Sequence, residues 1–374
     1  MVRNYLVRVG ALISAAVLSL LATSGWSQRL TWLGTLGGSS SYAYGISADG
    51  SAVVGGSWAP GNSYVPFRWT AGDGMRSLDV RTGWGAARGV SAGGAVVVGW
   101  DASQGRETAF RWTEAGGMQS LGTLGGGWSM AYGVSADGNV VVGCSEADGR
   151  RRAFRWTPST GMEDIGTLGG AQGAAYAVSA DGSIVVGSAW DTEVRERAFR
   201  WTETGGMQNL GTLGGVWSMA YGVSANGNVV VGWSHDAAGQ KRAFRWTAQT
   251  GMENLDTLNS PLSEAWGVSA DGSIVVGWMR DEQSQERAFR WTVSRGMEDL
   301  NRVYARLLTD GSVLEYARAI SADGRYIVGY GWNATALRTE AFLLDTVPEP
   351  ASLMALSVGL FGVALRRRSN RSWS

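Results

Sequence analysis

One sequence motif recurs seven times along this 374-residue chain. Its clearest copy begins at Tyr132 and reads Tyr-Gly-Val-Ser-Ala-Asp-Gly-Asn-Val-Val-Val-Gly, then a polar loop, then Arg-Ala-Phe-Arg-Trp-Thr and Gly-Met-Glu-Asp-Ile-Gly-Thr-Leu-Gly-Gly, ending at Gly170. The serine of the first phrase marks every copy, at Ser47, Ser91, Ser135, Ser179, Ser224, Ser269 and Ser321. Repeats of about 40 to 50 residues are typical of solenoids, propellers and other arrays, so the repeat constrains the fold before any single residue does.

Each copy holds four short apolar phrases, in the clearest copy 131–135, 139–143, 153–157 and 162–168. Asp-Gly between the first two is a hairpin signal, and the Val-Val-Val of the second is β-branched and strand-prone. No phrase is long enough for a helix. Four strands in each of seven copies, with 56 glycines in the chain, predict an all-β fold, a seven-bladed β-propeller of four-stranded blades. The alternative is a parallel β-helix, whose coils usually have shorter repeats and whose open ends need caps.

The two ends of the repeat region are complementary. The chain after residue 27 opens with a lone fourth phrase, 30–38, and the last copy stops after its third phrase, 340–344. We therefore expect the N-terminal strand to close the last blade, with Thr31 to Leu36 pairing beside Ala341 to Leu344, which removes two exposed strand edges. A longer segment, 301–317, is expected to hold one short helix at 302–308.

The extreme N-terminus has the composition of a secretory signal peptide. Arg3 and Arg8 precede an apolar run, 9–22, which is followed by small residues. This pattern predicts a signal peptide over 1–27, removed by cleavage near Gln28, and a propeller domain over 28–346.

The extreme C-terminus, 347–374, has a different pattern. Pro348-Glu349-Pro350 precedes an apolar stretch, 351–365, and then a group of arginines. As a helix that stretch is about 22 Å long, which makes it a short transmembrane helix. The arginines would hold its end on the cytoplasmic side. An ordinary tail anchor is the alternative.

These C-terminal residues resemble the PEP-CTERM sorting signal of exopolysaccharide-producing Gram-negative bacteria. The residues that carry the resemblance are Pro348, Glu349, Pro350, Arg366, Arg367 and Arg368. It implies an exosortase-type processing enzyme as a partner and transient membrane anchoring by the C-terminal helix. It also implies export to the cell envelope or extracellular matrix of a Gram-negative bacterium.

The repeats carry a second resemblance. The phrases Arg-Ala-Phe-Arg-Trp-Thr and Gly-Val-Ser-Ala-Asp-Gly are similar to the HAF family of extracellular repeats, named for a His-Ala-Phe triplet. Here arginine stands in place of that histidine, as in Arg152-Ala153-Phe154. The family brings no biochemical activity with it.

Composition excludes several classes of function. The chain has 32 basic and 32 acidic residues, and six of the arginines lie in the two terminal segments, so the mature domain is net negative and unsuited to nucleic acid. Cys144 is the only cysteine, which rules out an intramolecular disulfide. We expect it to be a packed residue and the protein to be a monomer.

The search for catalytic residues is negative. His235 is the only histidine, so histidine-based triads and multi-histidine metal sites have no basis, and we expect it to be a surface residue. The aspartates of the Ser-Ala-Asp-Gly phrases lack the oxygen-ligand pattern of a calcium loop and are expected to make turns. We therefore predict no catalytic residue, no metal site and no cofactor.

One arginine lies between Phe and Trp on the third strand of six copies. The residues are Arg68, Arg111, Arg155, Arg200, Arg245 and Arg290. They could form a ring of anion ligands, or each could stack on a neighbouring tryptophan and pair with a turn aspartate. We expect the second, structural role.

Variation concentrates on one face of the predicted ring. We define the long-loop face as the face with the connections from second to third strands and from fourth strands to the next blade. The candidate ligand-binding residues there are Trp100, Trp128, Trp217, Trp233, Trp278, Asp101, Asp191, Asp236 and Asp281. Indoles beside carboxylates suit sugar rings, whose C–H faces stack and whose hydroxyls need acceptors. The alternative is that the tryptophans cap the blades and the acids solvate the loops.

Three functions follow. The first is an exported surface or matrix interaction protein that binds exopolysaccharide or another surface glycan through the long-loop face. The second is a polysaccharide-acting hydrolase or lyase, in which Asp191 or Asp236 would belong to an acid pair about 5 to 10 Å apart in a pocket. The third is a purely structural component of the envelope or biofilm.

Overall fold

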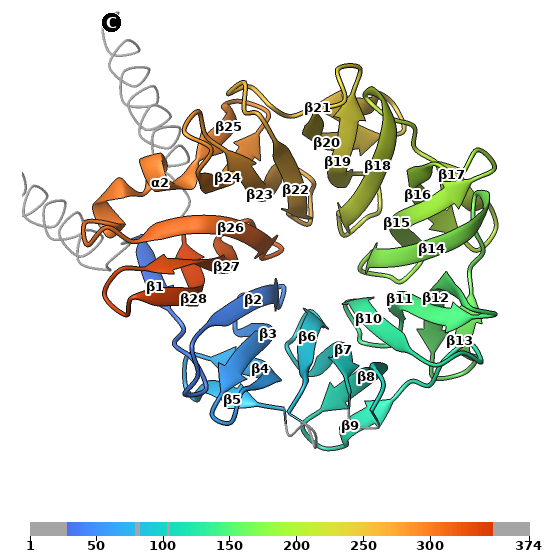
Figure 1. Cartoon of the computed structure of the whole chain (residues 1–374), viewed down its shortest axis with the longest axis horizontal. Helices are drawn as coiled ribbons and strands as arrows, with labels where there is room; N and C mark the ends of the chain where they lie inside the picture. Colours follow the sequence, from blue (N-terminus) through green and yellow to red (C-terminus); the bar gives the residue numbers. More distant parts are fainter. Residues whose placement is uncertain (1–27, 79–82, 103–104, 347–374) are drawn as a thin grey trace, which may run out of the picture. The chain divides into compact units, whose positions relative to one another are not determined.

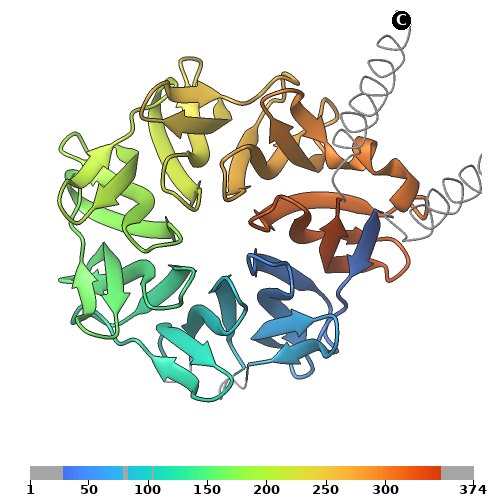
Figure 2. The same ribbon diagram turned by 180° about the vertical axis from the view of Figure 1, so that it is seen from behind.

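The computed structural model describes residues 28–78, 83–102 and 105–346. They form seven four-stranded antiparallel sheets arranged as blades around a ring (Figures 1 and 2). The seven-bladed β-propeller predicted from the repeat is confirmed. The predicted signal peptide, 1–27, and sorting segment, 347–374, lie outside the described residues.

The strands of each blade follow one another from the centre of the ring outward. The innermost strands are β2 (Ser41–Ile46), β6 (Gly85–Val90), β10 (Ser129–Val134), β14 (Gly169–Val178), β18 (Gly214–Val223), β22 (Ser263–Val268) and β26 (Val313–Ile320). The second strands are β3 (Ala52–Ala59), β7 (Val96–Asp101), β11 (Val141–Ala147), β15 (Ile184–Asp191), β19 (Val230–Asp236), β23 (Ile274–Arg280) and β27 (Tyr326–Asn333). Each blade is numbered after its innermost strand, from blade 1 (β2) to blade 7 (β26).

The outer half of each blade has one long and one short strand. The third strands are β4 (Ser63–Thr70), β8 (Thr108–Thr113), β12 (Arg150–Thr157), β16 (Glu196–Thr202), β20 (Lys241–Thr247), β24 (Glu286–Thr292) and β28 (Arg338–Asp345). The outermost strands are β5 (Gly74–Ser77), β9 (Gly117–Ser120), β13 (Gly161–Asp164), β17 (Gly206–Asn209), β21 (Gly251–Asn254), β25 (Gly296–Asp299) and, in blade 7, β1 (Arg29–Trp32).

Blade 7 is closed by the beginning of the described chain, as predicted. Strand β1 lies beside β28, and the Leu33 N–H donates to the Ala341 carbonyl at 2.8 Å. The strand ends at Trp32, so the pairing expected out to Leu36 was too long. The inserted segment holds two short turns, α2 (Leu300–Val303) and the 3-10 helix η1 (Ala305–Leu307), in place of one helix over 302–308. They are separated by Tyr304, whose side chain is buried in the core of blade 7.

A closed cycle of backbone hydrogen bonds joins the blades at the face opposite the long loops. The alanine that follows the serine of each turn between first and second strands donates its N–H to the carbonyl of the equivalent alanine in the next blade, over 2.9–3.1 Å. The cycle returns to its start, because Ala322 donates to Ala48. We call this the alanine belt; its members are Ala48, Ala92, Ala136, Ala180, Ala225, Ala270 and Ala322.

Each turn is held in shape by its serine and, in five of the seven blades, by the aspartate two residues later. Ser135 Oγ accepts the Val140 N–H at 2.9 Å and donates to Asp137 Oδ1 at 2.5 Å, and Asp137 also accepts the Asn139 N–H. The aspartates of these phrases therefore shape turns, as expected.

The space between blades is filled by third-strand aromatic residues. Phe67, Phe110, Phe154, Phe199, Phe244, Phe289 and Phe342 are all fully buried among valines of the neighbouring blade. The arginine beside the phenylalanine has a structural role but a different partner from the one expected. Arg68, Arg111 and Arg200 each donate Nε to the carbonyl of a turn glycine in the next blade, and not to a turn aspartate.

A β-bulge interrupts every innermost strand at the same place in the repeat. In blade 3 the register shifts between Ala131 and Gly133, so Tyr132 has no partner across the strand pair. Opposite the bulge, a Cβ at Gly143 would lie 1.9 Å from the Met130 carbonyl oxygen. Only glycine allows this approach, which explains the glycine that ends the Val-Val-Val phrase. Bulges re-aim side chains, and here the bulged residue lines the central channel.

Gly143→Ala should therefore destabilise the propeller by on the order of 1–3 kcal/mol or more, because the two strands must separate to admit the methyl group. Gly93→Ala is the matched control, since a Cβ there would meet nothing within 4 Å. Urea denaturation of both variants checks the prediction, and equal stabilities would contradict it.

The turn aspartates make the stability depend on pH. Hydrogen bonds from the Ser179 hydroxyl and the Ser183 N–H lower the pKa of Asp181 to about 2, from an ordinary value of 3.8. A carboxyl whose folded pKa lies below its unfolded pKa stabilises the fold above the unfolded value and loses that contribution as the pH falls through the folded value. Asp181→Asn should thus flatten the loss of stability between pH 3.8 and about 2.

Asparagine is compatible with this turn, because Asn226 accepts the same two hydrogen bonds in blade 5. The reciprocal change, Asn226→Asp, should steepen the acid loss. Denaturation curves across this pH range would show it, and identical slopes for the two variants would refute the assignment.

Candidate functional site

The structure separates the five expected tryptophans into two groups. Trp100, Trp233 and Trp278 are buried, with 5–8% of their surface exposed, and lie against the blades. Trp217 is 48% exposed, and Trp128 is half-buried. The five indoles therefore do not form one exposed platform, and only Trp128 and Trp217 are open to a ligand.

Trp217 belongs to a small aromatic cluster in blade 5. The ring of His235 lies 5.3 Å from both the Trp217 and the Trp233 rings, so this histidine is half-buried and not on the open surface as expected. Lys241 Nζ lies 4.1 Å from the Trp233 ring and pairs with Glu264 at 2.8 Å. Burial, and then the charge of Lys241, lower the pKa of His235, which is therefore neutral at pH 7.

The expected aspartates are engaged within the protein. Asp191, Asp236 and Asp281 each accept two backbone N–H groups of their own loop and pair with an arginine at 3.0–3.1 Å. Burial alone would raise the pKa of Asp191, but hydrogen bonds from the Arg195 N–H and the Arg197 guanidinium outweigh it and lower the pKa. Asp101 is buried at the end of β7. These carboxylates organise the loops between second and third strands.

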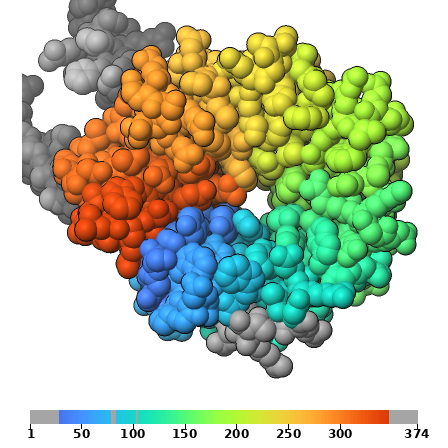
Figure 3. Space-filling view, viewed as in Figure 1, coloured from blue at the N-terminus to red at the C-terminus, as the bar shows by residue number. Residues whose placement is uncertain are grey.

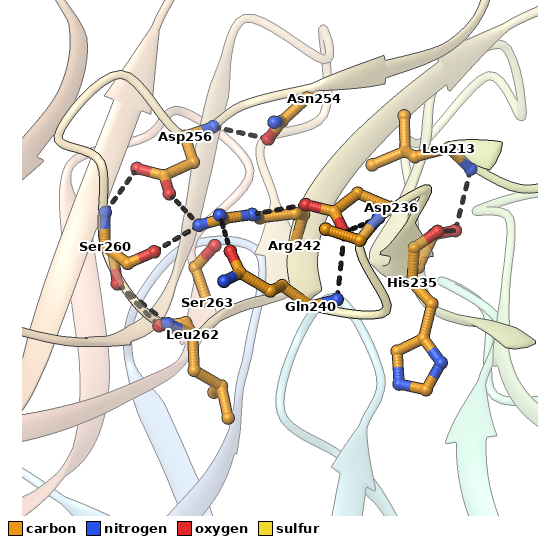
Figure 4. A network of polar contacts seen from close by, with 12 residues as sticks. Leu213, His235, Asp236, Gln240, Arg242, Asn254, Asp256, Ser260, Leu262 and Ser263 are labelled. Atoms are coloured by element: carbon orange, nitrogen blue, oxygen red, sulfur yellow. Dashed lines mark hydrogen bonds and ion pairs between the residues drawn. The ribbon is translucent and has the colours of Figure 1, made fainter. Parts of the chain in front are cut away.

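In blade 5 the carboxylate of Asp236 belongs to a network of hydrogen bonds and ion pairs (Figure 4). Arg242 pairs with Asp236 at 3.1 Å and with the buried Asp256 at 2.7 Å, and it also donates to the Ser260 carbonyl and the Gln240 side chain. Neither Asp191 nor Asp236 lines the groove or the channel described next.

A groove of about 570 Å³ lies on the long-loop face between blades 2 and 3. Trp84 and Trp128 line it together with Arg106, Glu107 and Glu146. Trp84 is 44% exposed and rests edge-on against Trp58, with ring centres 5.6 Å apart. The Glu146 carboxylate accepts the Gly127 N–H at 2.8 Å, which fixes one wall beside Trp128. We call this the tryptophan groove.

The second cavity is the central channel, with a volume of about 470 Å³ (Figure 3). Its lining includes the bulged residue of every blade, which together we call the channel ring: Tyr44, Arg88, Tyr132, Tyr176, Tyr221, Trp266 and Arg318. Aliphatic residues such as Ile46 and Val90 line the channel two positions further along each strand, toward the turns.

The tyrosine hydroxyls of the channel ring bond within the protein. Tyr221 Oη accepts from Trp233 Nε1 at 3.2 Å, and Tyr44 Oη lies 2.9 Å from Tyr64 Oη. Burial raises the pKa of Tyr132 and of Tyr221 above the ordinary value of 10.0, so both stay neutral. Of the ring residues only Arg88 and Arg318 carry charge.

Sequence reasoning missed Trp84 and the whole channel ring. Trp84 falls just before its strand, at a position where the other copies vary, as with Ser40, Trp128 and Leu262. The ring had a readable signal: the residue before Gly-Val-Ser changes among Tyr, Arg and Trp while its neighbours stay nearly constant. The bulge hid its direction, because strand alternation does not hold across it.

Among the residues that the structure describes, no group of three or more His, Cys, Asp or Glu side chains is placed to hold a metal ion. Within 28–78, 83–102 and 105–346, no helix has the length and apolar character needed to cross a membrane. The short transmembrane helix expected at 351–365 falls outside those ranges.

Comparison with known proteins identifies the C-terminal segment. Residues 346–368 match the PEP-CTERM protein-sorting motif. The motif indicates an exported protein that is sorted to the cell surface and processed by an exosortase. No curated protein sequence matches the chain.

Solved structures with a similar fold are distant in sequence. Oligogalacturonate lyase from Vibrio parahaemolyticus is 11% identical with a TM-score of 0.57, over 87% of this chain and 95% of that one. A structure of oligogalacturonate lyase in complex with manganese is 12% identical with a TM-score of 0.54 over the same shares. TolB from Acinetobacter baumannii is 13% identical with a TM-score of 0.47, over 90% and 69%. At these identities the likeness to the two lyases shows the fold alone.

Proposed function

We propose that this protein is an exported interaction protein that binds a polysaccharide of the producing cell's surface through the long-loop face. The observation that carries the proposal is the tryptophan groove, in which two indoles and two carboxylates share one cavity. Its volume of about 570 Å³ lies within the range of about 300–1,000 Å³ that is usual for ligand sites.

The chemistry of the groove suits a sugar. Indole faces pack on the C–H faces of pyranose rings, and the carboxylates of Glu107 and Glu146 accept from hydroxyls. Trp217, exposed in blade 5, offers a second place for the same polymer to stack. A chain laid across the long-loop face could use both, since weak subsites that act together raise affinity.

The rest of the proposal concerns location and relatives. We infer a signal peptide over 1–27, a mature propeller over 28–346 and a membrane-anchored intermediate that is released when the sorting segment is processed. The final location is the envelope or matrix of a Gram-negative bacterium, and the repeats belong to the HAF type.

Replacement of Trp84 or Trp128 by alanine should weaken binding to the cell's own polysaccharide by about 1 kcal/mol each, with little loss of stability, because the lost interaction is stacking. Trp156→Ala, in a buried core position, should instead cost about 3–5 kcal/mol of folding. Binding is measured by calorimetry and stability by melting temperature on the same samples.

Val293→Ala, at an apolar side chain 76% exposed in the turn between β24 and β25 on the opposite face, is the control and should leave binding unchanged. If the groove variants bind as well as the parent, or if no polysaccharide binds, the protein is a structural component and the proposal fails.

The same assay examines the enzymatic alternative, which one observation favours: Glu107 and Glu146 both line the groove. A glycoside-cleaving pair would release new chain ends from the polysaccharide during incubation. Release that is abolished by Glu107→Gln would favour the enzyme over the binding protein.

Deletion of residues 348–371 should release the protein into the medium, because processing and retention both depend on this segment. Cell fractionation with an antibody against the propeller measures the distribution. Retention of the deleted form in the membrane fraction would contradict the sorting role.

A further inference from the structure

The channel ring contains an uncompensated pair of positive charges. Arg88 and Arg318 lie on either side of Tyr44, with their guanidinium carbons 4.2 and 5.4 Å from the centre of its ring. Arg318 also lies 3.3 Å above the Trp266 ring. No aspartate or glutamate is among the residues that line the channel.

Neither arginine forms an ion pair with a carboxylate among the described residues, and Arg88 Nε is buried without a hydrogen bond. Arg197, Arg242 and Arg287 in the second-to-third-strand loops, by contrast, each have an aspartate at 3.0–3.1 Å. Burial, with the nearby charge of Arg88, lowers the pKa of Arg318. Both side chains are half-buried, and holding an unpaired charge partly away from water is costly, so these two arginines lower the stability of the empty propeller.

The propeller fold does not require charged residues at positions 88 and 318. The same bulged position holds tyrosine or tryptophan in the other five blades, and four of those rings pack in sequence at 4.3–5.4 Å: Tyr132, Tyr176, Tyr221 and Trp266. An aromatic residue would thus satisfy the fold at 88 and 318 as well. Groups that cost stability without serving the fold are typical of ligand sites.

We propose that the central channel is a second binding site, which takes a sugar bearing a carboxylate, such as a uronic acid residue of an acidic polysaccharide. Its carboxylate lies between Arg88 and Arg318, each of which can donate two parallel N–H groups. Its ring lies against the edges of the aromatic wall formed by Trp266 and the channel tyrosines, because Arg318 and Tyr221 already cover the faces of Trp266. This inference rests on the proposed function for its choice of a sugar, and on the channel alone for its choice of a carboxylate.

The wall favours a sugar over a bare inorganic anion. Beyond the two guanidinium groups, the ring offers aromatic surface, and the hydroxyls of Tyr44 and Tyr221 are engaged by Tyr64 and Trp233. A sulfate or phosphate would leave that surface unused. The channel volume of about 470 Å³ is within the usual range of about 300–1,000 Å³ for ligand pockets.

The first test uses the exported protein with free monosaccharides, and binding is measured by calorimetry. Glucuronate should bind about 10- to 100-fold more tightly than glucuronamide, which has the same shape without the charge, because a hydrogen bond to a charged group is worth more than one to a neutral group. Glucose should bind no better than glucuronamide. Equal affinity for glucuronate and glucuronamide, or sulfate binding as tightly as glucuronate, would overturn the proposal.

The second test uses variants. Arg88→Met and Arg318→Met should each lower glucuronate affinity by about tenfold or more, with a melting temperature in the absence of ligand that is unchanged or higher, because an unpaired charge has been removed. Arg76→Met makes the same change of net charge at an exposed site and should have no effect. Retained affinity in the channel variants, or an equal loss in Arg76→Met, would refute the site.

The proposals for the tryptophan groove and for the channel can be tested independently. Trp128→Ala should leave glucuronate binding intact, since Trp128 lines the groove and not the channel. Loss of polysaccharide binding in that variant with normal glucuronate binding supports both assignments. If either channel variant does not fold, the comparison of glucuronate with glucuronamide on the parent protein decides the question.

Discussion

The ring depends on the alanine belt. Seven N–H to carbonyl bonds run in one direction around the propeller and return to their starting residue, so no donor or acceptor in the cycle is left without a partner. A backbone bond does not depend on which side chain is present, and it therefore sets the distance between neighbouring blades in the same way at each junction. The serine of each turn, with an aspartate in five of the seven blades, holds the alanine at the angle that the belt requires.

With spacing fixed in this way, residues at the channel can vary without altering the ring. The glycine opposite each bulge allows the strand to deviate, and the bulge turns one side chain toward the axis. That side chain is Tyr, Trp or Arg, while the residues around it are nearly the same in every blade. Within about a dozen residues, each repeat thus combines a turn and strands whose backbone is the same in every blade with one bulge position whose side chain varies. This is possible because the strand, the bulge and the turn are each short.

The fold could be predicted in detail because the repeat presents the same information seven times. The count of blades, the order of strands, the turn role of Asp137 and closure by the N-terminal strand all follow from phrase order alone, and the structure has each of them. The short helix was misplaced, because Tyr304 is buried by contacts from a neighbouring strand that the local sequence does not record.

The candidate site was less accessible to sequence reasoning. Trp100, Trp233 and Trp278 each follow the glycine of a second strand, and whether an indole there points to solvent or folds onto the blade depends on the room left by the adjacent blade. Asp191 and Asp236 resemble exposed acids until the loop brings Arg197 and Arg242 back to them, six residues later. The wrong predictions therefore concern mainly the directions of side chains, whereas the strand topology was predicted correctly.

One consequence follows from where the two channel arginines fall. A ring of seven similar blades has no natural starting point, and a ligand on its axis could rotate among equivalent settings. Arg88 and Arg318 remove that equivalence, because they stand in blades 2 and 7, on either side of Tyr44 in blade 1. The channel therefore has two different sides. Its positively charged side is formed by blades 7 and 2, and its aromatic side by blades 3 to 6. A ligand on the axis is thus oriented, although the backbone of the ring is nearly symmetric.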